Sequence, residues 1–153
     1  MNWKIPLFDL DYGPEEEQAV LDVLRSRWLT MGEVTQRFEA AFAEACGVKH
    51  AVAVANGTVA LHLACLGVGI EPGDEVIVPA LTFVATAACV RYVGATPVFA
   101  DVTGPDDLTL SPQSVESLIT PRTRAIIVMH YAGYSCDMNA FRALAEKYNL
   151  KLI

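Results

Sequence analysis

The sequence predicts an α/β fold in which a mostly parallel sheet carries helices on both faces. From His50 onward, short β-branched runs alternate with helical segments, as they do in successive βαβ units. Turn residues fill the connections between them, as in residues 67–75 and 93–97. With 153 residues, 53% of them hydrophobic, the chain has enough material for one domain with a buried core.

Two helices are expected ahead of this alternating region. The first begins at Pro14, has acidic residues in its first turn and ends near Arg25 and Arg27, which suits the helix dipole. The second covers residues 33–46 and ends at Gly47, a natural C-cap. A turn that contains Trp28 and Thr30 joins them.

The remaining elements follow from short apolar runs and their caps. Strands are expected at residues 51–55, 75–78, 97–100, 125–129 and 150–153. Helices are expected at residues 58–66, 82–92, 112–119 and 138–148, with Ser111 and Asp137 as N-caps. The chain ends inside the last expected strand, where a natural domain rarely stops, because loops after parallel strands carry the chemistry of such folds.

Composition excludes several classes of function. A net charge of -7 and scattered basic residues argue against nucleic acid or an anionic membrane as partner. The apolar stretch 76–100 is interrupted by proline, glycine and arginine, so it is not a membrane span. Without a signal peptide, the cytoplasm is the expected location, with four reduced and mostly buried cysteines. Histidine and cysteine spacing predicts no metal site.

The ends of the expected strands are where a ligand would bind. Asn56, Gly57 and Thr58 follow one such strand and open a helix, so free backbone amides and the Thr58 hydroxyl could hold a phosphate. An asparagine N-cap followed by a turn glycine explains the same tripeptide equally well. The glycine fingerprint of nicotinamide-dependent Rossmann enzymes is absent, and so is a Walker loop.

Four further side chains are candidates. Phe83 follows a strand and could stack on a flat heterocycle, although a phenylalanine in an apolar run usually belongs to the core. His130 and Tyr131 end another strand and could orient a substrate, while Tyr131 could equally cap the core. In the leading turn, Trp28 could contact a ligand or form a hydrophobic staple.

Taken in order, the motifs resemble the DegT/DnrJ/StrS family of sugar aminotransferases, which use pyridoxal 5'-phosphate (PLP) and have fold type I, like aspartate aminotransferase. The likeness spans the chain. The segments that carry it are Ile5-Pro6-Leu7, Trp28-Leu29-Thr30-x-Gly32, Ala55-Asn56-Gly57-Thr58, residues 69–79, Thr82-Phe83, residues 94–99, residues 120–126 and His130-Tyr131-Ala132-Gly133.

The resemblance implies specific roles. Gly57 and Thr58 would contact the cofactor phosphate, and Phe83 would stack on the pyridine ring. Trp28, Thr30, His130 and Tyr131 would line the substrate side. The family moves an amino group from an amino acid, usually glutamate, to a keto-sugar nucleotide, and its members form homodimers.

By the same resemblance, residues 1–153 form the N-terminal part of the large PLP-binding domain. The rest of that domain, the pyridine-binding Asp, the Schiff-base lysine and a small C-terminal domain are expected beyond Ile153, so the chain alone is expected to be inactive. A dehydratase of the same family, and a binding module for a phosphorylated ligand that lacks catalysis, are the alternatives.

Overall fold

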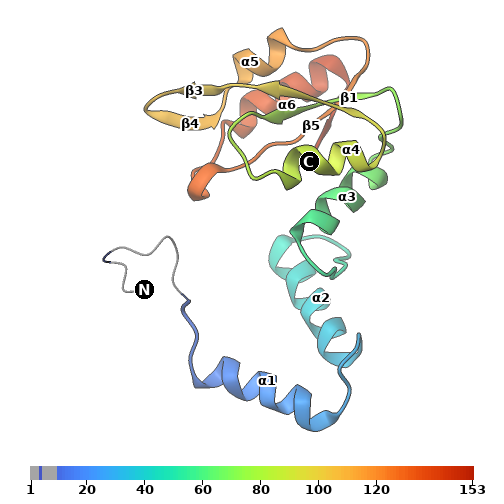
Figure 1. Cartoon of the computed structure of the whole chain (residues 1–153), viewed down its shortest axis with the longest axis vertical. Coiled ribbons are helices and arrows are strands. Elements are labelled where there is room, and N and C mark those ends of the chain that lie inside the picture. The colour runs from blue at the N-terminus through green and yellow to red at the C-terminus, as the bar shows by residue number, and fades with distance from the viewer. Residues whose placement is uncertain (1–3, 5–9) are drawn as a thin grey trace. The chain divides into compact units, whose positions relative to one another are not determined.

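The computed structural model describes Lys4 and residues 10–153, and the chain divides into two compact units, residues 1–53 and residues 54–153. The segment Ile5-Pro6-Leu7 lies outside the described residues. Unit 1 contains helices α1 (Pro14–Ser26) and α2 (Glu33–Cys46), and all the strands of the described residues belong to unit 2 (Figure 1).

The two helices of unit 1 confirm their predicted bounds. Pro14 occupies the start of α1, and the Glu16 carboxylate accepts a hydrogen bond of 2.7 Å from the Gly13 amide. That bond lowers the pKa of Glu16. Helix α2 ends at Gly47, whose φ of 65° is the left-handed conformation that glycine adopts readily.

Unit 2 is built on a four-stranded parallel sheet in the order β2-β1-β5-β6. Its elements are α3 (Gly57–Gly67), β1 (Glu75–Pro79), α4 (Ala85–Tyr92), β2 (Thr96–Ala100), β3 (Val102–Gly104), β4 (Asp107–Leu110), α5 (Pro112–Ser117), β5 (Thr123–Ile126), a short 3-10 helix (Tyr131–Gly133), α6 (Met138–Tyr148) and β6 (Lys151–Leu152). The side chains of Ser111 and Asp137 cap α5 and α6 as expected.

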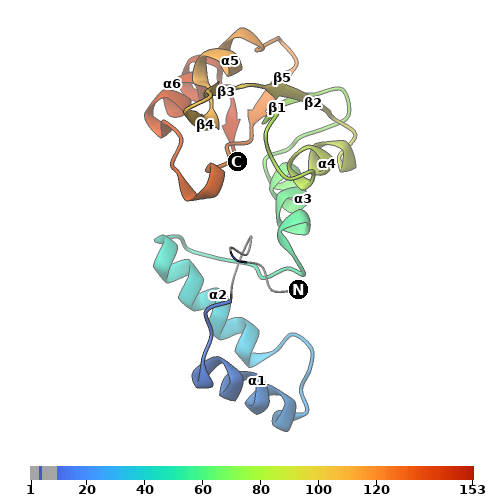
Figure 2. The same ribbon diagram turned by 60° about the vertical axis from the view of Figure 1, so that its left-hand side comes forward.

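The central strand β1 is buried on both faces, as a parallel strand between two helix layers must be. Val76 and Val78 pack with Cys65 of α3 and Cys89 of α4, whereas Ile77 packs with α5 and α6 on the other face. Figure 2 shows α3 and α4 on one side of the sheet and α5 and α6 on the other. The predicted fold class is therefore confirmed.

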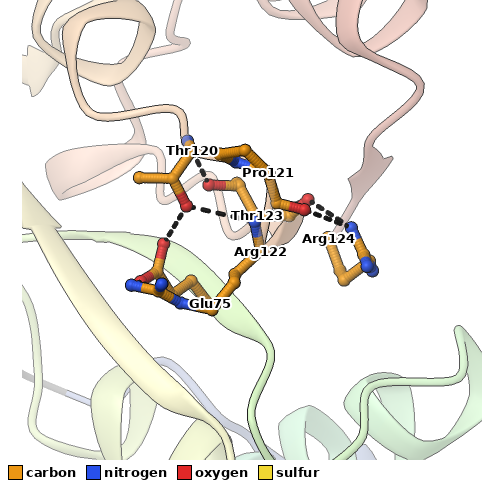
Figure 3. Close-up of polar contacts among 6 residues, drawn as sticks. All are labelled: Glu75, Thr120, Pro121, Arg122, Thr123 and Arg124. Carbon is orange, nitrogen blue, oxygen red and sulfur yellow. Dashed lines mark hydrogen bonds and ion pairs between the residues drawn. The ribbon is translucent and has the colours of Figure 1, made fainter.

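A polar cluster fixes the start of β1. The Glu75 carboxylate accepts hydrogen bonds from the Thr120 hydroxyl and from the Arg122 guanidinium, with the Arg122 Nε atom at 2.9 Å (Figure 3). The Glu75 side chain is only 9% exposed. The Thr120 bond, and then the Arg122 bond, lower the pKa of Glu75.

One strand prediction was wrong, and one pair of strands was missed. Residues 51–55 form no strand, because the Ala53 amide donates to the Glu39 side chain at 2.8 Å and no described strand pairs with the segment. The antiparallel hairpin β3–β4 was not predicted, because its strands are only three and four residues long. Helix α4 also begins at Ala85 instead of Thr82.

Candidate functional site

The start of α3 combines a capped helix with open amides. The Asn56 side-chain oxygen accepts a hydrogen bond from the Val59 N–H at 3.0 Å, and the Asn56 backbone carbonyl accepts one from the Ala60 N–H at 3.1 Å. Among the described residues, none accepts a hydrogen bond from the amides of Gly57 or Thr58. The N-cap interpretation is thus correct, and it leaves two donors at the positive end of the helix for an anion.

The space over Gly57 is also open. No described atom lies within 4 Å of the position that a Cβ at Gly57 would take, and Thr58 is half-buried. A phosphate could therefore reach the backbone there. Because residues 51–55 are not a strand, Asn56, Gly57 and Thr58 do not follow a strand end as the sequence predicted.

Phe83 does not belong to the core. The alternative that the apolar run around it favoured, a buried core phenylalanine, is therefore wrong. Its side chain is 73% exposed. Just before it, the Thr82 hydroxyl is 2.7 Å from that of Thr86 and 3.1 Å from the Met129 sulfur. The Phe83 carbonyl accepts the Thr86 N–H at 3.0 Å. These contacts fix the backbone on both sides of an aromatic ring that is free to stack.

His130 and Tyr131 follow β5 and face different surroundings. The His130 Nδ1 atom accepts the Cys136 N–H at 3.2 Å, so the proton of the neutral ring is on Nε2. Tyr131 is half-buried and lines an open cavity of about 550 Å³ together with Asp106, Asp107 and Tyr134. The structure thus brings Tyr131 next to the hairpin β3–β4.

No hydrogen bond or ring contact joins Phe83 to the first turn of α3 among the described residues.

Trp28 and Thr30 lie in unit 1, in the turn between α1 and α2. They line an open groove of about 700 Å³. The Trp28 indole N–H donates to the Met31 carbonyl at 3.0 Å, and the side chain stays 62% exposed. Trp28 is therefore held by a polar bond within its own turn.

Two features, one in each unit, escaped the sequence analysis. Asp107 in the hairpin forms a hydrogen bond of 2.7 Å with the Thr109 hydroxyl and one of 3.0 Å with the Thr109 amide, which lower the pKa of Asp107. The Gly104-Pro105-Asp106 turn was a signal that could have predicted the hairpin. The other feature is Gly32, which lies against the Trp28 ring.

Three further expectations concern the cysteines, membrane-spanning helices and metal sites. All four cysteines are free, and Cys65, Cys89 and Cys136 are buried, as expected. No helix within residues 10–153 has the length and apolarity to cross a membrane. Across Lys4 and residues 10–153, no three His, Cys, Asp or Glu side chains gather where they could hold a metal ion.

The structure combines a parallel α/β layer with a helix start whose first amides are open, which is an architecture of nucleotide and phosphate-cofactor enzymes. A family model narrows this class further, because it matches residues 11–153. The chain belongs to the DegT/DnrJ/EryC1/StrS aminotransferase family.

Individual relatives agree with this assignment. The chain is 48% identical over 139 residues to the GDP-perosamine synthase of Caulobacter vibrioides (strain ATCC 19089 / CIP 103742 / CB 15), and the match covers 90% of this chain and 37% of that protein. It resembles DesV of S. venezuelae, solved with a ketimine intermediate, with 45% identity and a TM-score of 0.84 over 90% of this chain and 37% of DesV.

A third relative was solved with the cofactor. The PLP form of Spr1654 from Streptococcus pneumoniae is 33% identical, with a TM-score of 0.87 over 97% of this chain and 38% of that one. The chain thus spans little more than a third of the length of these relatives.

Proposed function

We propose that this chain forms the N-terminal part of the large domain of a PLP-dependent aminotransferase, which transfers an amino group from an amino acid, with glutamate as the expected donor, to a keto-sugar nucleotide. The first turn of α3, with two unpaired amides beside a threonine hydroxyl, carries the proposal. Membership of the family and the likeness to a GDP-perosamine synthase support it. The Schiff-base lysine and the pyridine-binding Asp are expected outside the 153 residues.

The described residues fit two parts of the cofactor. The amides of Gly57 and Thr58, with the Thr58 hydroxyl, would bind the phosphate, because they are donors at a positive helix end. The exposed ring of Phe83 would lie against the pyridine. When bound, PLP supplies an electron sink for the carbanion of amino transfer. The work of this chain is to bind and orient that group.

The substrate side would use the remaining candidates. His130 presents an Nε2–H donor while its Nδ1 is occupied by Cys136, so it can donate a hydrogen bond to a substrate oxygen. Tyr131 lines a cavity large enough for a sugar ring, and its hydroxyl would bind the substrate there. Trp28 and Thr30 would contribute from the turn of unit 1.

We further propose that the complete protein is a cytoplasmic homodimer that binds small molecules only. The net charge of -7 supports the absence of a nucleic-acid partner, because phosphate backbones attract clustered lysine and arginine.

Spectroscopy of the complete protein tests the proposal. Addition of glutamate to the PLP-loaded protein should convert the absorbance of the aldehyde cofactor to that of the amine, and a keto-sugar nucleotide should reverse the change. Phe83→Ala should weaken cofactor binding, whereas Val84→Ala, an equally exposed neighbour, should not. Sugar dehydration without a glutamate-dependent change would show the dehydratase branch, and phosphate binding without either reaction would show a binding module.

A further inference from the structure

The turn between α1 and α2 contains an unusual contact between Trp28 and Gly32. A Cβ on Gly32 would lie 2.5 Å from the indole nitrogen of Trp28 and 2.7 Å from Cδ1. Real Cβ atoms do not approach other heavy atoms so closely, so a side chain at Gly32 must displace the ring or the backbone. The ring has little freedom to yield, because its N–H is bonded to the Met31 carbonyl at 3.0 Å.

Capping does not explain a glycine at this position. Gly32 is the N-cap of α2 and makes no side-chain cap bond, whereas Ser, Thr, Asp or Asn would bond to a free amide there. Its φ of -169° is extended backbone that any residue adopts. The close approach of the indole therefore accounts for the glycine.

The fixed ring faces open space. Trp28 is 62% exposed, although it is held at both its backbone and its indole nitrogen: the Trp28 amide donates to the Ser26 hydroxyl at 3.1 Å. Polar residues line part of the groove of about 700 Å³ around it, among them Thr30, Glu33 and Gln36. An aromatic face with hydrogen-bonding groups at its border suits a planar ring that has polar edges.

We propose that Gly32 is a positioning residue that holds Trp28 as a stacking platform for the base of the nucleotide substrate. The identity of the ligand rests on the proposed function, whereas the positioning of Trp28 by Gly32 does not. Gly32 acts only through Trp28. Glu33 and Gln36 line the same groove, and their polar side chains would meet the edge of the base.

The variant Gly32→Ala tests the positioning step in the complete protein. The part of the indole N–H spectrum and of the near-ultraviolet circular dichroism that disappears in Trp28→Phe belongs to Trp28 and reports the orientation of its ring. Both signals should change in Gly32→Ala. Gly13→Ala is the matched control, because Gly13 is the N-cap of α1 and a Cβ there meets only Glu16 at 3.8 Å. Unchanged Trp28 signals in Gly32→Ala would overturn the proposal.

Ligand titration tests the platform. GDP should quench Trp28 fluorescence and inorganic pyrophosphate should not, and Gly32→Ala should weaken GDP binding on the order of tenfold, the scale of one stacked base. Trp28→Phe, which keeps a smaller ring at the same site, should weaken it less than Trp28→Ala. Quenching by glucose 1-phosphate without quenching by GDP, or GDP affinity that survives displacement of Trp28, would overturn the proposal. Neither result would alter the glutamate-dependent spectral change, which tests the proposed function separately.

Discussion

Replacing Glu75 with glutamine removes the charged acceptor that ties the start of the central strand to the Thr120–Arg124 turn (Figure 3). The glutamine keeps one carbonyl oxygen, but its amide group would face the Arg122 guanidinium, which can only donate. The bond from the Glu75 amide to the Arg122 carbonyl, at 2.9 Å, is unaffected because it involves the backbone.

The magnitude follows from the burial of each partner. A hydrogen bond to a charged acceptor contributes about 1.5–3 kcal/mol to folding, and the Thr120 bond falls in this range because the Glu75 side chain is nearly buried. The Arg122 side chain is 68% exposed, so its ion pair contributes about 1 kcal/mol or less. We therefore expect Glu75→Gln to lower the free energy of unfolding by about 2–3 kcal/mol.

The dependence on pH has a definite sign. The pKa of Glu75 in the folded state is lowered from its ordinary value of 4.5. Its stabilising contribution is therefore complete above about pH 4.5 and is lost as the pH falls through the lowered folded pKa. The free energy of unfolding should differ between wild type and Glu75→Gln by about 2–3 kcal/mol at every pH from about 6 to about 8, and this difference should shrink in acid.

Urea unfolding of the two proteins, followed by circular dichroism at several pH values, measures this difference. Glu71→Gln is the matched control, because Glu71 is exposed and its carboxylate makes no bond to another described residue. Equal midpoints for Glu75→Gln and Glu71→Gln at pH 7 would refute the reasoning. A difference in the free energy of unfolding between wild type and Glu75→Gln that grows below about pH 4.5 would refute it as well.

Two further predictions concern the core of unit 2. Ile77→Ala should lower the free energy of unfolding by about 2–5 kcal/mol, because Ile77 is fully buried in the middle of β1, and urea unfolding with an unchanged midpoint would contradict this. Burial raises the pKa of the Cys65 thiol to about 12, so iodoacetamide at pH 8 should modify the exposed Cys46 in the native protein and reach Cys65 only after unfolding. Mass spectrometry that finds Cys65 modified as fast as Cys46 would show that the core is open.

The elements that could be predicted from the sequence are those whose own residues determine them. Residues 76–79 of β1 are apolar because both faces of the strand are covered, and α5 and α6 begin at the side-chain caps Ser111 and Asp137. Residues 51–55 show the limit of such patterns, because an apolar alternating run becomes a strand only where another strand pairs with it. In hairpin β3–β4 the Gly104-Pro105-Asp106 turn was visible in the sequence, but the pairing of Val102 with Leu110 was not, because local propensity does not reveal which strands pair.

The candidate site was predictable in its chemistry and less so in its geometry. The tripeptide Asn56-Gly57-Thr58 indicated both a cap and an anion site; the bond from the Val59 amide to Asn56 confirms the cap, and the anion site stays a prediction. The exposure of Phe83 could not be read from its apolar neighbours, because it depends on where the chain turns after β1. The contact of Gly32 with Trp28 arises from the path of the turn.

The relative affinity for PLP and for pyridoxal, which lacks the phosphate, tests the phosphate site most directly. The complete protein should prefer PLP, and Thr58→Val should reduce this preference by roughly tenfold or more, because a hydrogen bond to a charged group contributes about 1.5–3 kcal/mol. Thr96→Val, an exposed threonine at the start of β2, is the control that should leave the preference unchanged. An undiminished preference for PLP in Thr58→Val would contradict a phosphate site at the start of α3.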